Sequence, residues 1–292
     1  MNGILLIDKP EGWTSNDVVI KLKGMLRQRR IGHSGTLDPM ATGLLVVFVG
    51  RATRAVEFAE ADSKRYTAGL RLGMITDTQD TTGTVLERRP VCVTDDELIG
   101  ALSGFLGPQQ QIPPMYSAIK INGQRLYDIA RKGVEVERKA RNIEIASIEL
   151  LARDEENCVL DVRCSKGTYI RTLCHDIGAS LGCGGCMSSL RRTQAGVFDL
   201  SNAYTLADVQ SAADKGEAEK LLLPVDRLFS VYPVWSAAPS QTKRIKNGNE
   251  LKVSLANGRY RVYSAEGEFL MLGDVSNGVM TTVKSFFEVE VP

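Results

Sequence analysis

The chain has 292 residues, with 36 Lys and Arg against 35 Asp and Glu, and a net charge of +1. This length suits one large domain and a small one, with ample room for an apolar core. Hydrophobic residues make up 43% and charged residues 24%, which is ordinary for a soluble globular protein. No apolar run approaches the roughly 20 residues needed to cross a bilayer. The N-terminus lacks a basic segment before its short apolar run, so we expect no signal peptide, a cytoplasmic protein and reduced cysteines.

The positive charges cluster along the chain, although the net charge is close to zero. Cations outnumber acids by seven to one in residues 21–54, seven to three in 120–141 and six to one in 243–261. Acids balance them in 77–97 and 208–219. Such segments favour contact with a polyanion over part of the surface. The alternative is that they form ordinary solvated faces.

The first predicted elements are a short strand over residues 3–8 and a helix that starts at Thr14 and Ser15. Asp17 favours the first turn of this helix. The apolar residues that follow at helical spacing predict its buried face: Val18, Val19, Leu22, Met25 and Leu26. Further along, residues 44–49 predict a buried strand and 64–73 a half-buried one.

The most distinctive run of the chain is GHSGTLDPMATG, residues 32–43. It holds one carboxylate, Asp38, in a loop between Gly35 and Gly43, which both permit sharp changes of direction. Pro39 biases Asp38 toward an extended backbone. A carboxylate held on a constrained loop beside cations is typical of an ionised catalytic group, although a bare Leu-Asp-Pro would predict only a tight turn.

The middle third of the chain predicts an insertion at about residues 112–141. A capping box at residues 94–97 starts a helix before it. Two prolines then interrupt 111–118, Asn122 and Gly123 predict a tight hairpin turn, and a short basic helix follows. This basic insertion could grip a ligand, or it could be a connecting hairpin with ordinary surface lysines.

The second half begins with a predicted strand over 159–164, which a turn links to a helix carrying Tyr169 and Arg171 at its start. Thr205 predicts the cap of another helix. From about residue 232, Asn-Gly and Glu-Gly turns recur roughly every ten residues, which predicts a compact all-β module. We place the domain boundary near residue 230.

The cysteines offer one alternative site. Cys174, His175, Cys183 and Cys186 could supply four zinc ligands. Cys174 and His175 are adjacent on a predicted helix and therefore point about 100° apart, which makes chelation of one ion awkward. We therefore expect buried or idle thiols and no metal.

Six segments, in chain order, resemble motifs of the TruB family of pseudouridine synthases, which isomerise uridine within RNA. They are residues 3–15 (GILLIDKPEGWTS), 32–43, 64–66 (KRY), 112–131 (IPPMYSAIKINGQRLYDIAR), 165–172 (SKGTYIRT) and 189–193 (SLRRT). The detailed match is to the bacterial stand-alone enzymes that modify uridine 55 in the T loop of tRNA. A guide-RNA-dependent branch of the same superfamily shares the GHSGTLDP core and is the alternative, as is a non-catalytic tRNA-binding protein.

The resemblance implies a catalytic set of three residues. Asp38 takes the place of the nucleophile, Tyr66 that of the aromatic residue that stacks on the base, and Arg171 that of the partner of the aspartate. We expect Arg171 to hold Asp38 through a forked hydrogen bond that lysine could not reproduce. The Tyr66 hydroxyl belongs to the chemical class that could help to remove the C5 proton.

The resemblance also implies substrate-contacting and supporting residues. His33 corresponds to a residue that contacts the T loop, and Tyr66, Tyr169 and Leu190 to residues that contact the extruded uridine. Lys9 and Pro10 belong to a motif that supports the site from below.

The implied fold is α+β. Residues 1–230 would form the catalytic domain, a large mixed, mainly antiparallel sheet flanked by helices, with a thumb-like insertion at about 112–141. Residues 231–292 would form a small PUA-like β-barrel. The resemblance further implies a monomer that binds tRNA and needs no cofactor, metal or protein partner.

Overall fold

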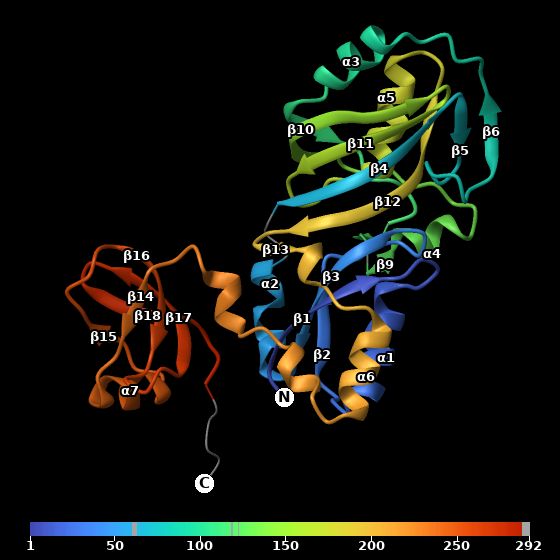
Figure 1. The fold of residues 1–292 in the computed structure, drawn as a ribbon. Coiled ribbons are helices and arrows are strands. Elements are labelled where there is room, and N and C mark those ends of the chain that lie inside the picture. The colour runs from blue at the N-terminus through green and yellow to red at the C-terminus, as the bar shows by residue number, and fades with distance from the viewer. Residues whose placement is uncertain (60–62, 118, 122, 288–292) are drawn as a thin grey trace.

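A computed structural model describes residues 1–59, 63–117, 119–121 and 123–287. Within these residues, nine strands form one large sheet (Figure 1). The order of the main path is β1-β3-β12-β4-β11-β10-β7, with β2 added to β3 and β13 to β12. The strands are β1 (Gly3–Lys9), β2 (Ile31–Ser34), β3 (Thr42–Val49), β4 (Lys64–Leu72), β7 (Gly107–Gln111), β10 (Arg141–Asp154), β11 (Asn157–Cys164), β12 (Gly185–Ala195) and β13 (Phe198–Asp199). Only β12 and β3 pair in parallel, so the predicted mixed, mainly antiparallel sheet is confirmed for the described residues.

Helices cover the sheet on the sides that its apolar residues require. The helical segments of the large domain are α1 (Ser15–Met25), η1 (Gly50–Ala55), α2 (Val56–Ala59), α3 (Asp95–Ser103), α5 (Ile170–Ser180), η2 (Leu200–Asn202), α6 (Leu206–Asp214), η3 (Ala218–Leu221) and η4 (Val225–Phe229). Alternate residues of β1 and β3 face opposite sides, because successive side chains of a strand alternate. One side packs on α1 and α6, and the other on α2 and η4. Farther along the sheet, α3 and α5 cover β4, β10 and β11.

Three of the helices begin at threonines that local sequence identifies. Thr14, Thr94 and Thr205 each accept a hydrogen bond from the backbone three residues on, and the acid at that position bonds back to the threonine amide. These reciprocal bonds satisfy backbone groups that a helix start leaves open. The starts predicted for these three helices are confirmed.

The strand β2 was not predicted. His33, expected in the glycine-punctuated loop, lies on this strand and pairs with Val47 of β3. The four residues of β2 include a glycine and a histidine and show no apolar alternation, so only their pairing with β3 defines them as a strand. The loop that carries Asp38 therefore starts at Gly35.

The C-terminal module is a five-stranded sheet with the order β14-β16-β17-β18-β15. Its strands are β14 (Val234–Ser236), β15 (Leu251–Lys252), β16 (Gly258–Tyr263), β17 (Phe269–Ser276) and β18 (Val279–Ser285). Asn277 and Gly278 form the tight turn predicted between β17 and β18, both with positive φ. Together with the large domain, this small β domain confirms the α+β fold class.

The expectation that this module is all-β was wrong, because it contains the helix α7 (Pro239–Lys246). Pro239 stands in its first turn, where proline fits a helix, and Ile245 is buried against the sheet. Asn247 and Gly248, predicted as a hairpin turn, instead end this helix, with Gly248 at φ +77°. An Asn-Gly pair serves both kinds of turn, and the sequence alone did not separate them.

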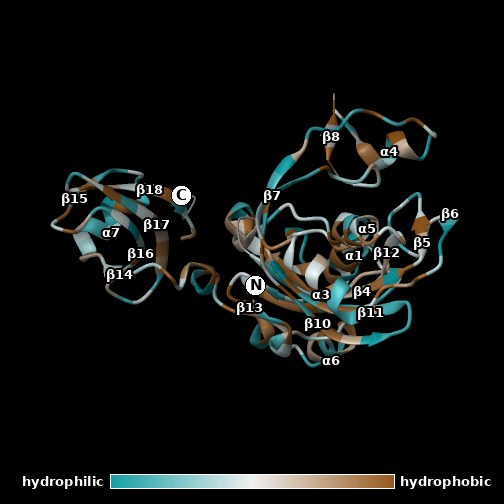
Figure 2. Cartoon of the chain, turned by 90° about the horizontal axis from the view of Figure 1, so that it is seen from above, coloured by the Kyte–Doolittle hydropathy of each residue, from teal (hydrophilic) through white to brown (hydrophobic). Residues whose placement is uncertain are grey.

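The insertion leaves the sheet at the end of β7 and returns at the start of β10. It contains β8 (Lys120–Ile121), β9 (Gln124–Arg125) and α4 (Leu126–Ala130). The hairpin predicted here is present, although Asn122 of its turn lies outside the described residues. Figure 2 shows the insertion standing apart from the body of the domain. Two further strands, β5 (Met74–Thr76) and β6 (Val85–Arg88), form a separate hairpin.

Two negative findings concern the described residues. None of their helices has the length and apolar character needed to cross a membrane. They also contain no cluster of three His, Cys, Asp or Glu side chains that could hold a metal ion. All six cysteines are free thiols.

Candidate active site

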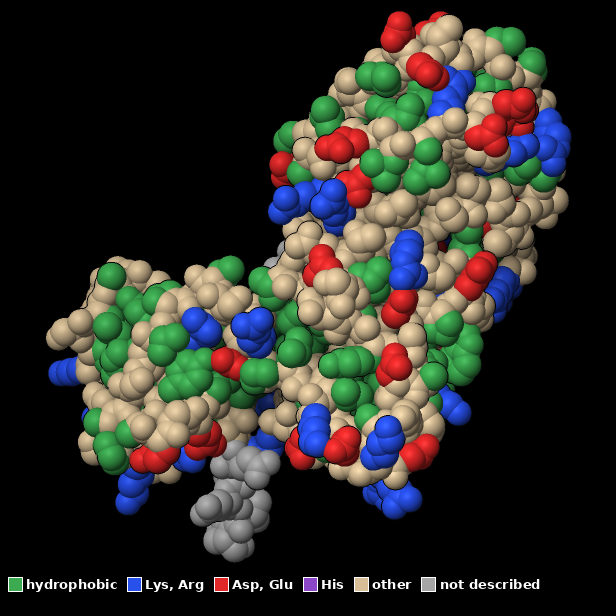
Figure 3. Space-filling model, viewed as in Figure 1, with side chains coloured by type: hydrophobic (Ala, Val, Ile, Leu, Met, Phe, Trp, Pro, Cys, Tyr) green, Lys and Arg blue, Asp and Glu red, His purple; other side chains and the backbone are tan. Residues whose placement is uncertain are grey.

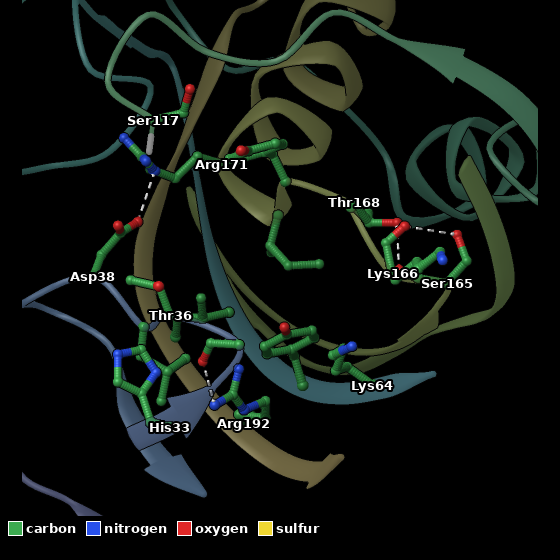
Figure 4. Close-up of a pocket in the computed structure, with 17 residues that line it drawn as sticks. His33, Thr36, Asp38, Lys64, Ser117, Ser165, Lys166, Thr168, Arg171 and Arg192 are labelled. Atoms are coloured by element: carbon green, nitrogen blue, oxygen red, sulfur yellow. Dashed lines mark hydrogen bonds and ion pairs between the residues drawn. The ribbon is translucent and has the colours of Figure 1, made fainter. Parts of the chain in front are cut away.

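One cavity of about 330 Å³ is lined by side chains from five parts of the chain (Figure 4). Its lining includes all six residues to which the sequence assigned catalysis or substrate contact: His33, Asp38, Tyr66, Tyr169, Arg171 and Leu190. They come from β2, the loop before β3, β4, the start of α5, and β12. Residues up to 157 positions apart thus meet at one point. Lys9 and Pro10 are not part of this lining.

Asp38 and Arg171 form an ion pair across the cavity. Arg171 Nε lies 3.1 Å from Asp38 Oδ2. The Asp38 side chain is 40% exposed whereas that of Arg171 is 7% exposed, so the carboxylate is open to the cavity and the cation is buried.

The forked hydrogen bond expected between these two residues was wrong. The two terminal nitrogens of Arg171 point elsewhere: Nη1 donates to the carbonyl of Thr78 at 3.2 Å and Nη2 to that of Tyr116 at 2.6 Å. These bonds fix the plane of the guanidinium and leave Nε for Asp38. Arginine suits this position because its three nitrogens donate to three different groups, and not because two of them bind one carboxylate.

Asp80 is a second acid beside Arg171 that the sequence did not reveal. Its Oδ2 lies 3.6 Å from Arg171 Nη1, and its side chain is 6% exposed. Its Oδ1 accepts bonds from the hydroxyls of Thr78 and Thr82, at 2.9 and 2.6 Å. Asp80 lies in the acidic region 77–97, for which the sequence predicted only that its acids balance the charge of the basic segments.

The backbone around Asp38 is tied down on both sides. Before it, Ser15 Oγ donates to the Leu37 carbonyl at 3.1 Å and accepts from the Leu37 amide at 2.9 Å. After it, the fully buried Lys9 donates to the Pro39 carbonyl at 3.3 Å and to those of Pro10 and Trp13 at 2.9 and 2.6 Å. Burial lowers the pKa of Lys9 to about 8, against the opposing influence of the Asp38 carboxylate.

Arg192 lies behind Tyr66 and was also missed by the sequence analysis. Its side chain is buried, and it donates to the carbonyl of Leu44 at 2.7 Å and to that of Gly35 at 2.8 Å. A Cβ at Gly35, which has φ +68°, would stand 3.0 Å from Arg192 Nη1, so glycine gives the guanidinium room. Burial raises the pKa of Tyr66, while Arg192, bonded to its hydroxyl, acts in the opposite direction.

Three further residues of the lining, His33, Tyr169 and Leu190, present ring or apolar surface to the cavity. Burial lowers the pKa of His33, which favours its neutral form, and raises the pKa of Tyr169. Leu190 on β12 packs against the core beside them. Among the described residues that line the cavity, Asp38 is the one carboxylate, whereas a retaining glycosidase would need two about 5 Å apart.

Comparisons with known proteins identify the family to which the sequence is similar. Residues 23–170 match the model for the N-terminal domain of TruB family pseudouridylate synthases, and residues 171–230 match the model for the C-terminal domain of tRNA pseudouridylate synthase B. A curated relative from Clostridium kluyveri, named tRNA pseudouridine synthase B, is 41% identical over 98% of this chain and 100% of its own length. One of the same name from Ralstonia nicotianae is 45% identical over 92% of this chain and 87% of its own.

Solved structures show the same fold. The structure titled "Crystal Structure of a Cbf5-Nop10-Gar1 Complex" matches with a TM-score of 0.76 and 26% identity, covering 98% of this chain and 85% of that one. Sequence and structural similarity thus extend over both domains. The chain belongs to the TruB family of pseudouridylate synthases.

Proposed function

We propose that this chain isomerises uridine to pseudouridine in tRNA, at position 55 of the T loop. One observation carries the proposal: a half-exposed Asp38, ion-paired to a buried Arg171, faces a cavity walled by Tyr66, Tyr169 and Leu190. The full-length relatives named tRNA pseudouridine synthase B support the reaction and the class of substrate.

The reaction breaks the bond from ribose C1′ to uracil N1 and forms one from C1′ to C5. The proton on C5 is lost and N1 gains one, so the isomerisation is balanced without an oxidant or reductant. Asp38 can attack C1′, assist elimination across the sugar, or add to uracil C6. In each case the carboxylate must be held in a fixed orientation, which the ion pair with Arg171 and the tethered loop provide. The base must leave its stack to enter the cavity, at a cost of a few kcal/mol that phosphate contacts offset.

Tyr66 would hold the uracil during its rotation. Its ring is buried in the cavity wall and offers a face for stacking, and its hydroxyl, which is bonded to Arg192, is the group that we assign to the C5 proton. Tyr169 and Leu190 would confine the ring on other sides, and His33 would contact the T loop. Lys9 and Pro10 would act from below, through the backbone that carries Asp38.

We further propose that the enzyme acts as a monomer in the cytoplasm, without a guide RNA or protein partner. The guide-dependent alternative has its support in a ribonucleoprotein of the same fold, an H/ACA RNP bound to a substrate RNA, but the identity of that chain to this one is only 25%. Relatives named tRNA pseudouridine synthase B are 41–46% identical, which favours the tRNA enzyme. A binding protein without activity would not need the paired Asp38 and Arg171.

The decisive experiment uses the purified chain alone and a T-stem-loop transcript that carries a tritium label on C5 of uridine 55. We expect tritium release and pseudouridine at that position. A transcript labelled at another uridine of the loop should release none. Activity that appeared only after addition of a guide RNA or of other proteins would support the guide-dependent alternative, and binding without release would support the non-catalytic one.

A further inference from the structure

The insertion is joined to the sheet at a paired position. Gln111, the last residue of β7, lies opposite Arg141, the first residue of β10. The chain leaves the sheet after Gln111, forms the hairpin and α4, and returns at Arg141 (Figure 2). The insertion is therefore attached to the sheet at Gln111 and Arg141.

The side chain of Gln111 does not face solvent. It is 4% exposed and reaches the backbone of Tyr169, at the start of α5. Its Oε1 accepts from the Tyr169 amide at 2.8 Å, and its Nε2 donates to the Tyr169 carbonyl at 3.1 Å. One amide thus holds both backbone groups of a single residue. Tyr169 is the N-cap of α5 and makes no capping bond with its own side chain.

The same stretch of chain also holds Arg171. The carbonyl of Tyr116, five residues after Gln111, accepts from Arg171 Nη2 at 2.6 Å. Residues at the root of the insertion therefore contact the catalytic segment twice, at the backbone of Tyr169 and at the guanidinium that faces Asp38. Orientation of that guanidinium depends on both the start of α5 and the root of the insertion.

We propose that Gln111 is a positioning residue for the isomerisation, which couples the root of the insertion to the Tyr169–Arg171 segment and so sets the orientation of Arg171 toward Asp38. The proposal rests on the proposed function. It assigns to Gln111 a role in the chemical step rather than in RNA affinity, because the side chain is buried and out of reach of phosphates.

The chemistry of the side chain explains why it is glutamine. A primary amide presents a donor nitrogen and an acceptor oxygen in one plane, which matches the C=O and N–H of one residue. An ionised glutamate has two acceptor oxygens, and one of them would face the Tyr169 carbonyl oxygen and repel it. A protonated glutamic acid again has one donor and one acceptor. Methionine has a similar length and makes neither bond.

The test compares Gln111→Met and Gln111→Glu with Gln110→Met, a matched change at the exposed neighbour on the same strand. Single-turnover rates are measured on the labelled T-stem-loop, and affinities are measured in an Asp38→Asn background. We expect Gln111→Met to lower the rate at least about tenfold with an affinity within about twofold of the parent. Gln110→Met should change neither. A change in affinity with no change in rate would overturn the proposal.

Two further measurements separate positioning from a general structural role. The rate of Gln111→Glu relative to wild type should rise as the pH falls from 8 to 5.5, because protonation of the carboxyl restores the missing donor; a constant ratio would overturn the proposal. This result does not depend on whether Gln111→Met folds. In an Arg171→Lys background, Gln111→Met should cost less than about twofold, since the group it positions is gone. If the rate losses of Gln111→Met and Arg171→Lys multiply in full in the double variant, Gln111 does not act through Arg171.

The outcomes for the two proposals are distinct. If the wild-type chain does not release tritium, the proposed function fails. If the wild type is active and Gln111→Met reacts at the wild-type rate, only the role of Gln111 fails.

Discussion

The reactive carboxylate and its cation have opposite exposures, which separates their roles. Asp38 is reachable from the cavity, whereas Arg171 is enclosed by Asp80 and by the carbonyls of Thr78 and Tyr116. An ion pair between two exposed side chains contributes little to stability, because solvent screens both charges. Here the buried Arg171 is held by its other partners, and it orients the exposed Asp38.

The first prediction concerns Asp38. Replacement by asparagine keeps the shape of the side chain but removes its charge and nucleophilicity, so Asp38→Asn should bind the T-stem-loop and release no tritium above background. Asp96→Asn, an exposed acid in the first turn of α3, serves as the matched control and should leave the rate unchanged. Activity within about tenfold of wild type would rule out Asp38 as the nucleophile.

The second prediction concerns the Tyr66 hydroxyl. Tyr66→Phe retains the ring that stacks on uracil, whereas Tyr66→Leu removes both ring and hydroxyl. If the hydroxyl serves the C5 proton, Tyr66→Phe should lower the single-turnover rate and leave the affinity nearly unchanged. Tyr66→Leu should weaken binding as well. A wild-type rate for Tyr66→Phe would reduce its role to stacking.

At the scale of elements, the site depends on how β1, α1 and the Asp38 loop are joined. Lys9 ends β1 and binds the loop carbonyl of Pro39, and Ser15 starts α1 and holds Leu37. The position of Asp38 is therefore set by two secondary-structure elements rather than by the loop itself. Because burial lowers the pKa of Lys9, the stability of this junction depends on pH.

The third prediction follows from the lowered pKa of Lys9. Burial lowers it from 10.5 to about 8 in the folded chain. Between about pH 8 and 10.5 the unfolded chain binds this proton and the folded chain does not, so the free energy of unfolding should rise with pH across that window. We expect wild type to gain about 1–3 kcal/mol over Lys9→Met between these limits.

Urea denaturation at several pH values would measure this difference. Lys21→Met, at an exposed position of α1, is the control and should follow the wild-type profile. If the free energy of unfolding changes with pH in parallel for wild type and Lys9→Met, the proton on Lys9 does not contribute to the pH dependence of stability.

Elements with strong local signals were predictable, and contacts between distant segments were not. The capping threonines depend on the acid three residues on, which the sequence displays directly. Arg192 depends on carbonyls 148 and 157 residues away, and Gln111 on a backbone 58 residues away. No local pattern marks such a residue. The resemblance to a family located the cavity residues, but the bonds that hold them came from the structure.

At the scale of the whole molecule, an aromatic cluster joins the two domains. Phe229 at the end of η4 packs on Phe58 of α2 and on Phe269 and Phe286 of the C-terminal module, with ring centroids 5.3–6.1 Å apart. Lys284 adds an ion pair to Glu57 at 2.6 Å. The module therefore packs directly against the large domain. The division at residue 230 stays a prediction, and cutting there would uncover this cluster.

Four cations of the C-terminal module form hydrogen bonds within the protein. Arg244, Lys246, Arg259 and Arg261 bond to groups of this module or of the segment leading into it. Figure 3 shows acidic and basic side chains interspersed on the face in view, so no single-sign field covers that face. Lys243 and Lys252 are exposed and are the first candidates for phosphate contact.

The last prediction tests whether the C-terminal module holds RNA. A chain ending at residue 230 should bind full-length tRNA more weakly and with a flatter salt dependence, because phosphate contacts release counterions. Its turnover of the T-stem-loop should suffer less, since every residue assigned to chemistry lies at or before Leu190.

Truncation also exposes Phe229, so a second variant must keep the fold. The double substitution Lys243→Gln and Lys252→Gln removes charge alone and should reduce the salt slope on full tRNA by about one to two. Lys215→Gln, an exposed cation at the end of α6, is the control. The measurement is affinity at several salt concentrations for both RNAs. If the slope on full tRNA is unchanged in both the truncated chain and the double variant, the module does not clamp RNA and its cations form an ordinary solvated face.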